Sequence, residues 1–177
     1  MVQLVAVALY DRGHFSRGNA RRLFGYEAYH WGIVVMPEDS EEQDYRAYDA
    51  TDISEINPVT FRLSNPTMDW WYRVTENTES VVNPRLLGRI VIGQVPDGTS
   101  SAELREFFGR VRLPVKNTDP QQSCVTWTVD AIRALQTQGW GWEFELDQFK
   151  GWALSYADDR IREDSKEPSV KYYSVQD

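Results

Sequence analysis

The sequence predicts an α+β fold in which an antiparallel sheet packs against helices. Apolar, β-branched runs of strand length dominate the first half of the chain, whereas the strongest helical periodicities lie in the second half. A succession of strands followed by helices is typical of α+β folds with an antiparallel sheet. The chain has 177 residues, of which 41% are hydrophobic, and is therefore long enough to bury a core of its own.

Short apolar runs that end at turn residues predict the strands. The first strand is expected at residues 2–10 and the second at residues 28–36, where Pro37 follows. Residues 45–50 come after an acidic turn at 38–44, so the second and third strands are expected to form a hairpin. Further strands are expected at residues 60–63, 70–76, 87–95 and, near the end of the chain, 170–175.

Amphipathic patterns predict three helices, at residues 101–110, 123–138 and 146–162. The second has the clearest boundaries, because Ser123 is a favourable N-cap and Gly139 a favourable residue just past the C-terminus. Its apolar residues recur at the spacing of one helix face, at Val125, Val129, Ile132 and Leu135. This face is expected to pack on the sheet.

One domain is predicted over residues 1–177, with its core at about residues 2–162 and a C-terminal tail at 163–177. The stretches 11–25 and 113–122 contain glycine or proline and are predicted to be loops within that domain. Neither stretch is long enough to divide the chain, and no internal repeat is present.

Charge and cysteine content exclude several classes of protein. Nineteen Lys and Arg against 27 Asp and Glu give a net charge of −8, which repels phosphate backbones, so a small-molecule substrate is expected and a nucleic acid is not. The single cysteine excludes an internal disulfide. No apolar run reaches the ~20 residues of a membrane span, and residues 2–9 lack the features of a signal peptide. A cytoplasmic location is therefore expected, while nothing in the sequence predicts an oligomeric state.

Cys124 is the first candidate for chemistry, because it lies at the predicted start of a helix. The partial positive charge and the free N–H groups of a helix N-terminus favour a thiolate, which is the nucleophilic form of cysteine. The same N–H groups are suited to hold an oxyanion. Cys124 shares a helix face with Thr128 and Leu135, so the thiol is expected to point toward the sheet.

His30 is the candidate base, because it lies within a predicted strand that gives its side chain a defined direction. The strand period is expected to place it on the face of the sheet that meets the helix of Cys124. His14 is the other histidine and lies in a glycine-rich segment. Asp49 on the next strand is expected to lie across from His30 and to orient the imidazole, whereas Tyr48 points to the other face. The three residues would form a Cys–His–Asp arrangement. A lone cysteine on an apolar helix face more often fills a core, so the hypothesis depends on the combination.

No metal or other cofactor is expected. One cysteine and two histidines are too few ligands for zinc at any usual spacing.

The run YHWGIVV at residues 29–35, followed far downstream by SCVTWTVDAIRAL at 123–135, resembles the circularly permuted NlpC-type branch of papain-like cysteine enzymes, which includes lecithin:retinol acyltransferase. The layout of residues 2–140 also resembles an uncharacterised fungal domain family. The resemblance implies a permuted papain-like architecture with Cys124 as nucleophile and His30 as base. Asp49 falls where that branch often carries a second histidine. The N-C-E-H run of the acyltransferases is absent, so phospholipid transfer is not implied.

Arginine, tryptophan and glutamine side chains are the candidates for substrate binding. Arg12 and Arg17, together with Arg21 and Arg22, cluster in the segment before the histidine strand and would suit a carboxylate, a phosphate or a coenzyme A arm. The aromatic candidates for a pocket are Trp70 and Trp127, with Trp71, Trp140 and Trp142 as further members of the set. Gln122, or its neighbour Gln121, would add an oxyanion donor beside the cysteine. Each set also has a purely structural interpretation. The arginines would belong to a solvated loop, the tryptophans would fill the core or its rim, and the glutamines would lie in an exposed segment that leads into the helix.

The leading hypothesis is a hydrolase or acyl transferase that acts on a small amide, ester or thioester through Cys124 and His30. Two alternatives remain. A non-catalytic module would use the same cleft to bind a ligand, and an isomerase or cyclase would use His30 as acid and base while Cys124 is incidental. The reactivity of the thiol distinguishes them, because an activated cysteine reacts with iodoacetamide well below the ordinary thiol pKa of about 8.5.

Overall fold

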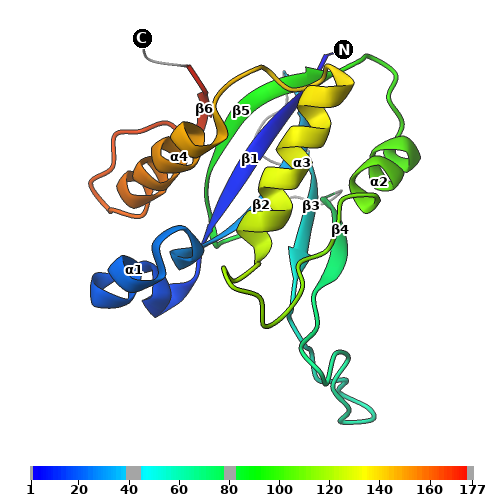
Figure 1. Ribbon diagram of the computed structural model, residues 1–177, viewed down its shortest axis with the longest axis vertical. Helices are drawn as coiled ribbons and strands as arrows, with labels where there is room; N and C mark the ends of the chain where they lie inside the picture. Colours follow the sequence, from blue (N-terminus) through cyan, green and yellow to red (C-terminus); the bar gives the residue numbers. More distant parts are fainter. Residues whose placement is uncertain (1, 39–44, 78–82, 175–177) are drawn as a thin grey trace.

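Six strands form one sheet in the order β4-β3-β2-β1-β5-β6 (Figure 1). The computed structural model describes residues 2–38, 45–77 and 83–174. Its strands are β1 Gln3–Asp11, β2 Tyr29–Pro37, β3 Tyr45–Thr51, β4 Trp71–Asn77, β5 Leu86–Val95 and β6 Val170–Tyr172. The α+β class is thus confirmed, and five of the strands lie within two residues of where the apolar runs predict them. Most of the acidic turn expected at 38–44 lies outside the described residues.

The sheet is antiparallel except at one edge, where β6 pairs with β5 in parallel. The prediction of a wholly antiparallel sheet is therefore wrong at this edge. The chain leaves the end of β5, passes through three helices and returns to the edge of the sheet at which β5 begins, and such a crossover brings the next strand back in the parallel direction.

Two further local predictions are wrong. Residues 60–63 do not form a strand, because there the chain makes a protruding loop with a single bridge between Ile56 and Leu63. Residues 11–25 are not a plain loop, since they contain a 3-10 turn at Gly13–Ser16 and the helix α1 at Gly18–Phe24. Two of the glycines that predict a loop mark the ends of α1 instead. Gly18 is its first residue and Gly25 follows its last, and both have the positive φ that glycine adopts readily, 58° and 59°.

The predicted helices in the second half are present as α2 Ser101–Gly109, α3 Cys124–Gln138 and α4 Leu146–Arg160. In α3 the cap predictions are confirmed: the hydroxyl of Ser123 accepts a hydrogen bond from the N–H of Val125, and Gly139 ends the helix with φ of 81°. The apolar face of α3 packs on β2 and β3, where its buried side chains join those of β1 and β5 in the larger core.

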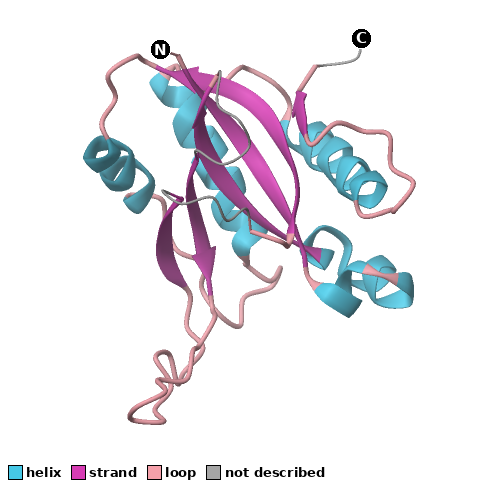
Figure 2. Ribbon diagram, turned by 180° about the vertical axis from the view of Figure 1, so that it is seen from behind, coloured by secondary structure: helices cyan, strands magenta, loops and turns pink. Residues whose placement is uncertain are grey.

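The helices leave one face of the sheet uncovered. In Figure 2 the strands lie in front, α3 lies behind them, and no helix crosses the face that is turned to the viewer. The alternation of side chains follows this arrangement. Tyr29, Trp31 and Ile33 of β2 pack in the helix-side core, whereas Val34 and Met36 belong to a smaller cluster on the other face. Across the described residues, no helix has the length and hydropathy that a membrane span requires.

Candidate active site

Cys124 is the first residue of α3 and is 5% exposed. The cap that precedes it is reciprocal, because the N–H of Ser123 donates to the hydroxyl of Thr126 at 3.0 Å while the hydroxyl of Ser123 accepts from Val125 at 3.2 Å. The N–H of Cys124 itself has no acceptor among the described residues. The thiol therefore lies at the positive end of a helix dipole, beside a free backbone donor.

His30 lies on the face of the sheet opposite to the one expected. Its register partner on β1 is Tyr10, which belongs to the cluster on the helix-free face, and the two rings are 5.6 Å apart. The neighbours of His30 along β2, Tyr29 and Trp31, occupy the helix-side core. The prediction that the strand period turns His30 toward the helix is thus wrong, because bulky aromatic residues fill those positions.

Asp49 accepts a hydrogen bond at its Oδ2 from Nε2 of His30, at 2.6 Å. The hairpin prediction places these two residues directly opposite each other, and this is wrong. The β2–β3 register sets Ile33 opposite Tyr48, and one step further Asp49 lies next to Gly32, where an added Cβ would be 3.1 Å from the Cβ of Asp49. Asp49 reaches His30 diagonally, across the space that the absent side chain of Gly32 leaves free.

Arg73 completes this group and is absent from the sequence-based set of candidates. It lies directly opposite Asp49 in the β3–β4 register, and its guanidinium holds both carboxylate oxygens, with Nε at 3.0 Å from Oδ1 and Nη2 at 2.7 Å from Oδ2. The side chain of Asp49 is 10% exposed and that of Arg73 is 31% exposed. The one available signal was the alternation of the 70–76 strand, which places an arginine on the face of the sheet that carries Asp49.

Cys124 meets His30 where β2 and β3 separate. The ladder between these strands runs from Val35 opposite Arg46 to Ile33 opposite Tyr48, so His30 and Asp49 lie beyond its end. Helix α3 packs on both strands, and the side chain of Cys124 lies close enough to His30 to raise the pKa of the imidazole. The thiol comes from the helix side of the sheet and the imidazole from the other side, and they meet at this opening.

Charges around His30 determine its protonation. Burial by itself lowers the pKa of the imidazole, but the neighbouring Cys124 sulfur and the hydrogen bond to Asp49 outweigh it and raise the pKa to about 10. Burial raises the pKa of Asp49, yet the hydrogen bonds from His30 and Arg73 bring it below its usual range. At neutral pH the site therefore holds an imidazolium between the carboxylate of Asp49 and the sulfur of Cys124.

A cavity of about 860 Å³ opens onto this group from the helix-free face. Its wall includes Cys124, His30, Asp49 and Arg73, with Tyr10 beside them. Alternate residues of β3 contribute to it, which is the pattern of side chains on one face of a strand. The volume suits a small organic molecule rather than a polymer.

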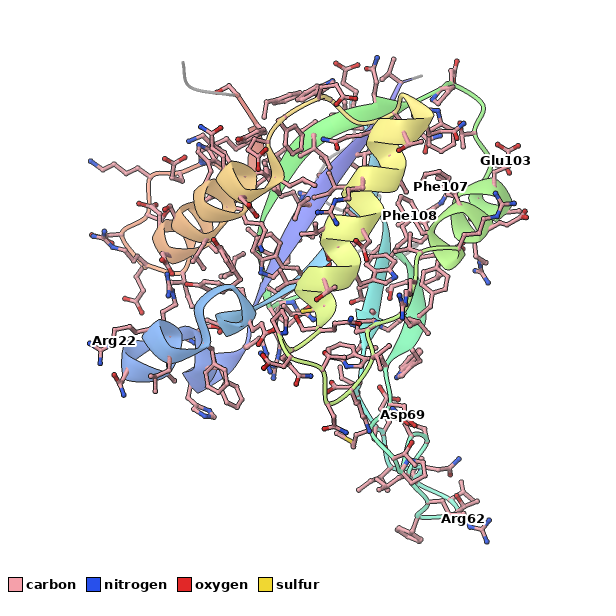
Figure 3. All side chains as sticks on the ribbon, in the orientation of Figure 1. Arg22, Arg62, Asp69, Glu103, Phe107 and Phe108 are labelled. Carbon is pink, nitrogen blue, oxygen red and sulfur yellow. The ribbon has the colours of Figure 1, made fainter. Side chains whose placement is uncertain are left out.

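Of the four arginines in the predicted cluster, Arg12 alone lines the cavity. Arg17 holds both carboxylate oxygens of Asp11 at 2.8 Å. Arg21 holds Asp158 of α4 in the same way, at 2.7 Å. Arg22 is hydrogen-bonded to Asn19 and points outward from α1, at the far edge of the molecule in Figure 3. The predicted role of Arg17, Arg21 and Arg22 in substrate binding is thus wrong, because none of them faces the cavity.

The tryptophans divide in the same manner. Trp70 lines the cavity, and its role in binding stays a prediction. Trp127 does not: it is fully buried on the core face of α3 against Tyr72 and Phe108, so the prediction of a binding role for it is wrong. The other members of the predicted set, Trp71, Trp140 and Trp142, lie outside the cavity wall as well.

Gln121 and Gln122 both line the cavity next to the cysteine. The side-chain oxygen of Gln122 accepts from the N–H of Val115 at 2.8 Å, and its amide nitrogen has no acceptor within the described ranges. The amide nitrogen of Gln121 donates to the neighbouring carbonyl of Gln122. Gln122 is therefore the better placed of the two to add an N–H group to the site.

Within the part of the chain that the structure describes, no group of three or more His, Cys, Asp or Glu side chains could hold a metal ion.

The fold and the site define an α+β domain with a thiol, an imidazole and a carboxylate joined at the mouth of a cavity. Residues 3–169 match the model of a family described as "Family of unknown function (DUF6914)", and the chain belongs to that family. No curated protein and no solved structure matches the chain.

Proposed function

We propose that this protein is a cysteine-dependent hydrolase or acyl transferase that acts on a small amide, ester or thioester. The observation that carries the proposal is the grouping of three side chains at the wall of a cavity: Cys124 interacts with His30, and His30 is hydrogen-bonded to Asp49 at 2.6 Å. Nucleophile, base and orienting group in contact are the arrangement that activates a thiol for attack on a carbonyl. A free thiol of this kind suits a reducing compartment, and we place the protein in the cytoplasm.

The first chemical step is acylation of Cys124. The sulfur attacks the carbonyl carbon of the substrate, and a carbon–sulfur bond forms while the carbonyl π electrons move onto oxygen. The tetrahedral intermediate then collapses, the bond to the leaving group breaks, and the imidazolium of His30 gives its proton to that group. Asp49 accepts from Nε2 of His30, so the other ring nitrogen, Nδ1, faces the reacting atoms.

Two donors are available for the oxyanion. Among the residues that the structure describes, neither the N–H of Cys124 at the start of α3 nor the amide nitrogen of Gln122 has an acceptor. Preorganised donors at this point stabilise the charge that develops in the transition state.

Deacylation reverses the roles. Water, or an acceptor alcohol, amine or thiol, loses a proton to His30 and adds to the thioester carbon. The carbon–sulfur bond breaks, and Cys124 leaves as the thiolate paired with the imidazolium. Hydrolysis and transfer share every step except the identity of this second nucleophile.

The order His30, Asp49, Cys124 along the chain agrees with a circularly permuted papain-like architecture, and we propose that relationship for the fold. The support is topological: a strand supplies the histidine, its neighbour in the sheet supplies the carboxylate, and a later helix begins at the cysteine. Such constellations are recognised by geometry and role, not by position in the sequence.

Covalent trapping tests the proposal. The protein is incubated with p-nitrophenyl acetate, release of nitrophenolate is followed in time, and intact-protein mass spectrometry detects an acetyl group on Cys124. We expect a rapid burst with acetyl-Cys124 in the wild type, and neither in Cys124→Ala or His30→Ala. Melting temperatures of the variants serve as the folding control.

Three results would overturn the proposal. If Cys124→Ala keeps full turnover while His30→Ala does not, the protein uses acid–base chemistry without a nucleophilic thiol. If folded wild type neither turns over the ester nor reacts faster with iodoacetamide than a free thiol does, the site binds ligands without catalysis. If acetylation occurs on residues other than Cys124, the nucleophile is wrongly assigned.

A further inference from the structure

We infer that the cavity binds an anionic group of the substrate, such as a carboxylate, phosphate or sulfonate, through Arg12 and Arg85. This inference names the substrate class of the active site and therefore rests on the proposed function. It is based on the charges that line the cavity on the β1–β5 side of His30.

Arg12 is a cation that is held in place with no carboxylate partner in the described part of the chain. Its Nη1 donates to the backbone carbonyl of Glu27, its guanidinium lies 4.9 Å from the ring centre of Phe15, and its own N–H is bound by Ser16. Among the described residues, its remaining guanidinium N–H groups have no acceptor. A guanidinium that is preorganised and retains free donors is well suited to a bidentate oxyanion.

Arg85 lies on the adjacent strand end and also lines the cavity. The N–H of Asp11 donates to the carbonyl of Arg85 at 2.8 Å, so the ends of β1 and β5 hold Arg12 and Arg85 near each other. Over the described ranges, the side chain of Arg85 is in no ion pair. It is exposed at the cavity rim, where a long side chain can follow a ligand.

Asp11, a carboxylate in the same part of the cavity wall, is already paired with another arginine. Asp11 is held by Arg17, and that interaction brings the pKa of Asp11 below its usual range, so the carboxylate stays ionised and paired. Arg17, which lies outside the cavity, makes the main interaction with Asp11, and the charge of Arg85 adds a smaller one. This neutral pair leaves two cations against the one carboxylate of Glu27 on this side.

The β3–β4 side of the cavity offers no free cation among the described residues and carries an unpaired carboxylate. In the sheet order, β2 with His30 separates the β1–β5 side from the β3–β4 side. There Arg73 is fully engaged by Asp49, and Asp52 lines the wall without an ion pair in the described part of the chain. An anionic ligand group is therefore attracted to the β1–β5 side, with the carbonyl in the middle at Cys124.

Aromatic residues beside Arg12 indicate the rest of the ligand. Phe15 and Phe24 line the cavity and meet edge to face, with ring centres 5.0 Å apart, and Phe24 is 45% exposed. Exposed aromatic surface next to a cation suits a short hydrocarbon segment that ends in an anion. The substrate class is thus an amide, ester or thioester that carries an anionic group on a hydrocarbon arm.

Charged thiol reagents test this inference on the full chain. The rate of Cys124 modification is measured with neutral methyl methanethiosulfonate, the anionic sulfonatoethyl reagent and the cationic trimethylammonium-ethyl reagent. The neutral reagent reports the reactivity and access of the thiol. The ratio of the anionic to the neutral rate reports the attraction of an anion, whether or not the protein turns over an ester.

We expect the anionic reagent to be the fastest of the three, although the net charge of the protein is −8. Arg12→Gln and Arg85→Gln should each lower the anionic-to-neutral ratio by roughly threefold, and salt at about 1 M should remove most of the difference. Arg22→Gln is the matched control, because Arg22 lies on α1 outside the cavity, and its ratio should be unchanged. Arg12→Lys should retain most of the ratio, which separates charge from the structural contacts of Arg12.

The outcomes separate the two proposals. A wild-type ratio near one, or equal ratios in the wild type and in both glutamine variants, overturns the anion site and leaves the thiol chemistry standing. A faster cationic reagent overturns it too and points to Asp52 and Glu27 as the binding groups. If none of the reagents modifies Cys124 in the folded protein, the cavity does not give access to the thiol, and the proposed function fails with it.

Discussion

Replacing Asp49 by asparagine isolates the role of the carboxylate that joins His30 to Arg73. The substitution keeps the shape of the side chain and removes its charge. Asp49 is 10% exposed on its side chain and receives hydrogen bonds from both partners, so the change leaves two cationic groups without their shared anion. We expect a lower pKa for His30, lower stability and slower turnover.

The size of the effect follows from the protonation of His30. Its pKa rises from 6.5 to about 10, which corresponds to about 5 kcal/mol of preference for the charged form, with the interactions of Cys124 and Asp49 both contributing. If the carboxylate supplies roughly 2 kcal/mol of this, the pKa falls by about 1.5. A similar loss of stability, moderated by the partial exposure of Arg73, lowers the melting temperature by about 4–8 °C.

The assays are a titration of the His30 ring by NMR and chemical unfolding at several pH values. Because the folded pKa of His30 lies above its unfolded value, the stabilisation is complete below about 6.5 and is lost as the pH rises through about 10. The pKa of Asp49 is lowered in the folded protein, so this carboxylate stabilises the fold at neutral pH. That stabilisation is lost in acid, as the pH falls below the ordinary range of the carboxyl group. The stability difference between wild type and Asp49→Asn should therefore be largest near neutral pH.

An unchanged His30 titration in Asp49→Asn would refute this reasoning, because the hydrogen bond and the charge of the carboxylate would then contribute nothing. A stability difference that stays constant from acid to alkaline pH would refute it as well, since packing alone carries no such pH dependence. Arg73→Met is a useful comparison, because it leaves Asp49 and His30 paired.

Further predictions concern the groups around this pair. Cys124→Ala should lower the pKa of His30 in the same NMR titration, at a packing cost of about 1 kcal/mol by chemical unfolding. An unchanged pKa would mean that the sulfur carries no charge beside the imidazole. Arg73→Lys should keep the fold but reduce kcat by roughly ten- to a hundredfold, since one ammonium cannot hold both oxygens of the carboxylate; a wild-type rate would deny Arg73 any positioning role. Trp127→Ala should destabilise the protein by about 3–5 kcal/mol, because Trp127 is in the core. Trp70→Ala should mainly raise KM, because Trp70 lines the cavity. The reverse result would show that Trp70 belongs to the core and Trp127 to the binding site.

Local signals predicted a large part of the fold. The limits of α3 could be predicted because Ser123 and Gly139 act on backbone groups within a few residues of themselves. The β-branched runs predicted their strands for a similar reason, since alternation is a property of neighbouring residues. The short helix α1 escaped prediction. Its Arg21 is held by Asp158 of α4, a contact 137 residues away that no local pattern contains.

The active site could be predicted only in part. A histidine within a strand and a cysteine at a helix start were visible as residue types in defined places. The role of Arg73 was not, because it depends on the β3–β4 register, which sets a residue 24 positions away opposite Asp49. The face of His30 was also misjudged, because either face of β2 could have turned toward a helix, and Tyr29 and Trp31 took the helix side.

The sequence by itself determined the class of the fold, the capped helix that begins at Cys124 and the strand that carries His30, because these depend on interactions between residues close together in the chain. The tertiary structure alone decided that the thiol and the imidazole meet where β2 and β3 separate, that Arg73 clamps Asp49, and that Arg12 faces the cavity while Arg17 does not. An arginine has the same pattern of neighbours in the sequence whether its side chain binds a ligand, pairs with a carboxylate or lies in solvent. Only the packing of distant strands and helices assigns each of them its partner.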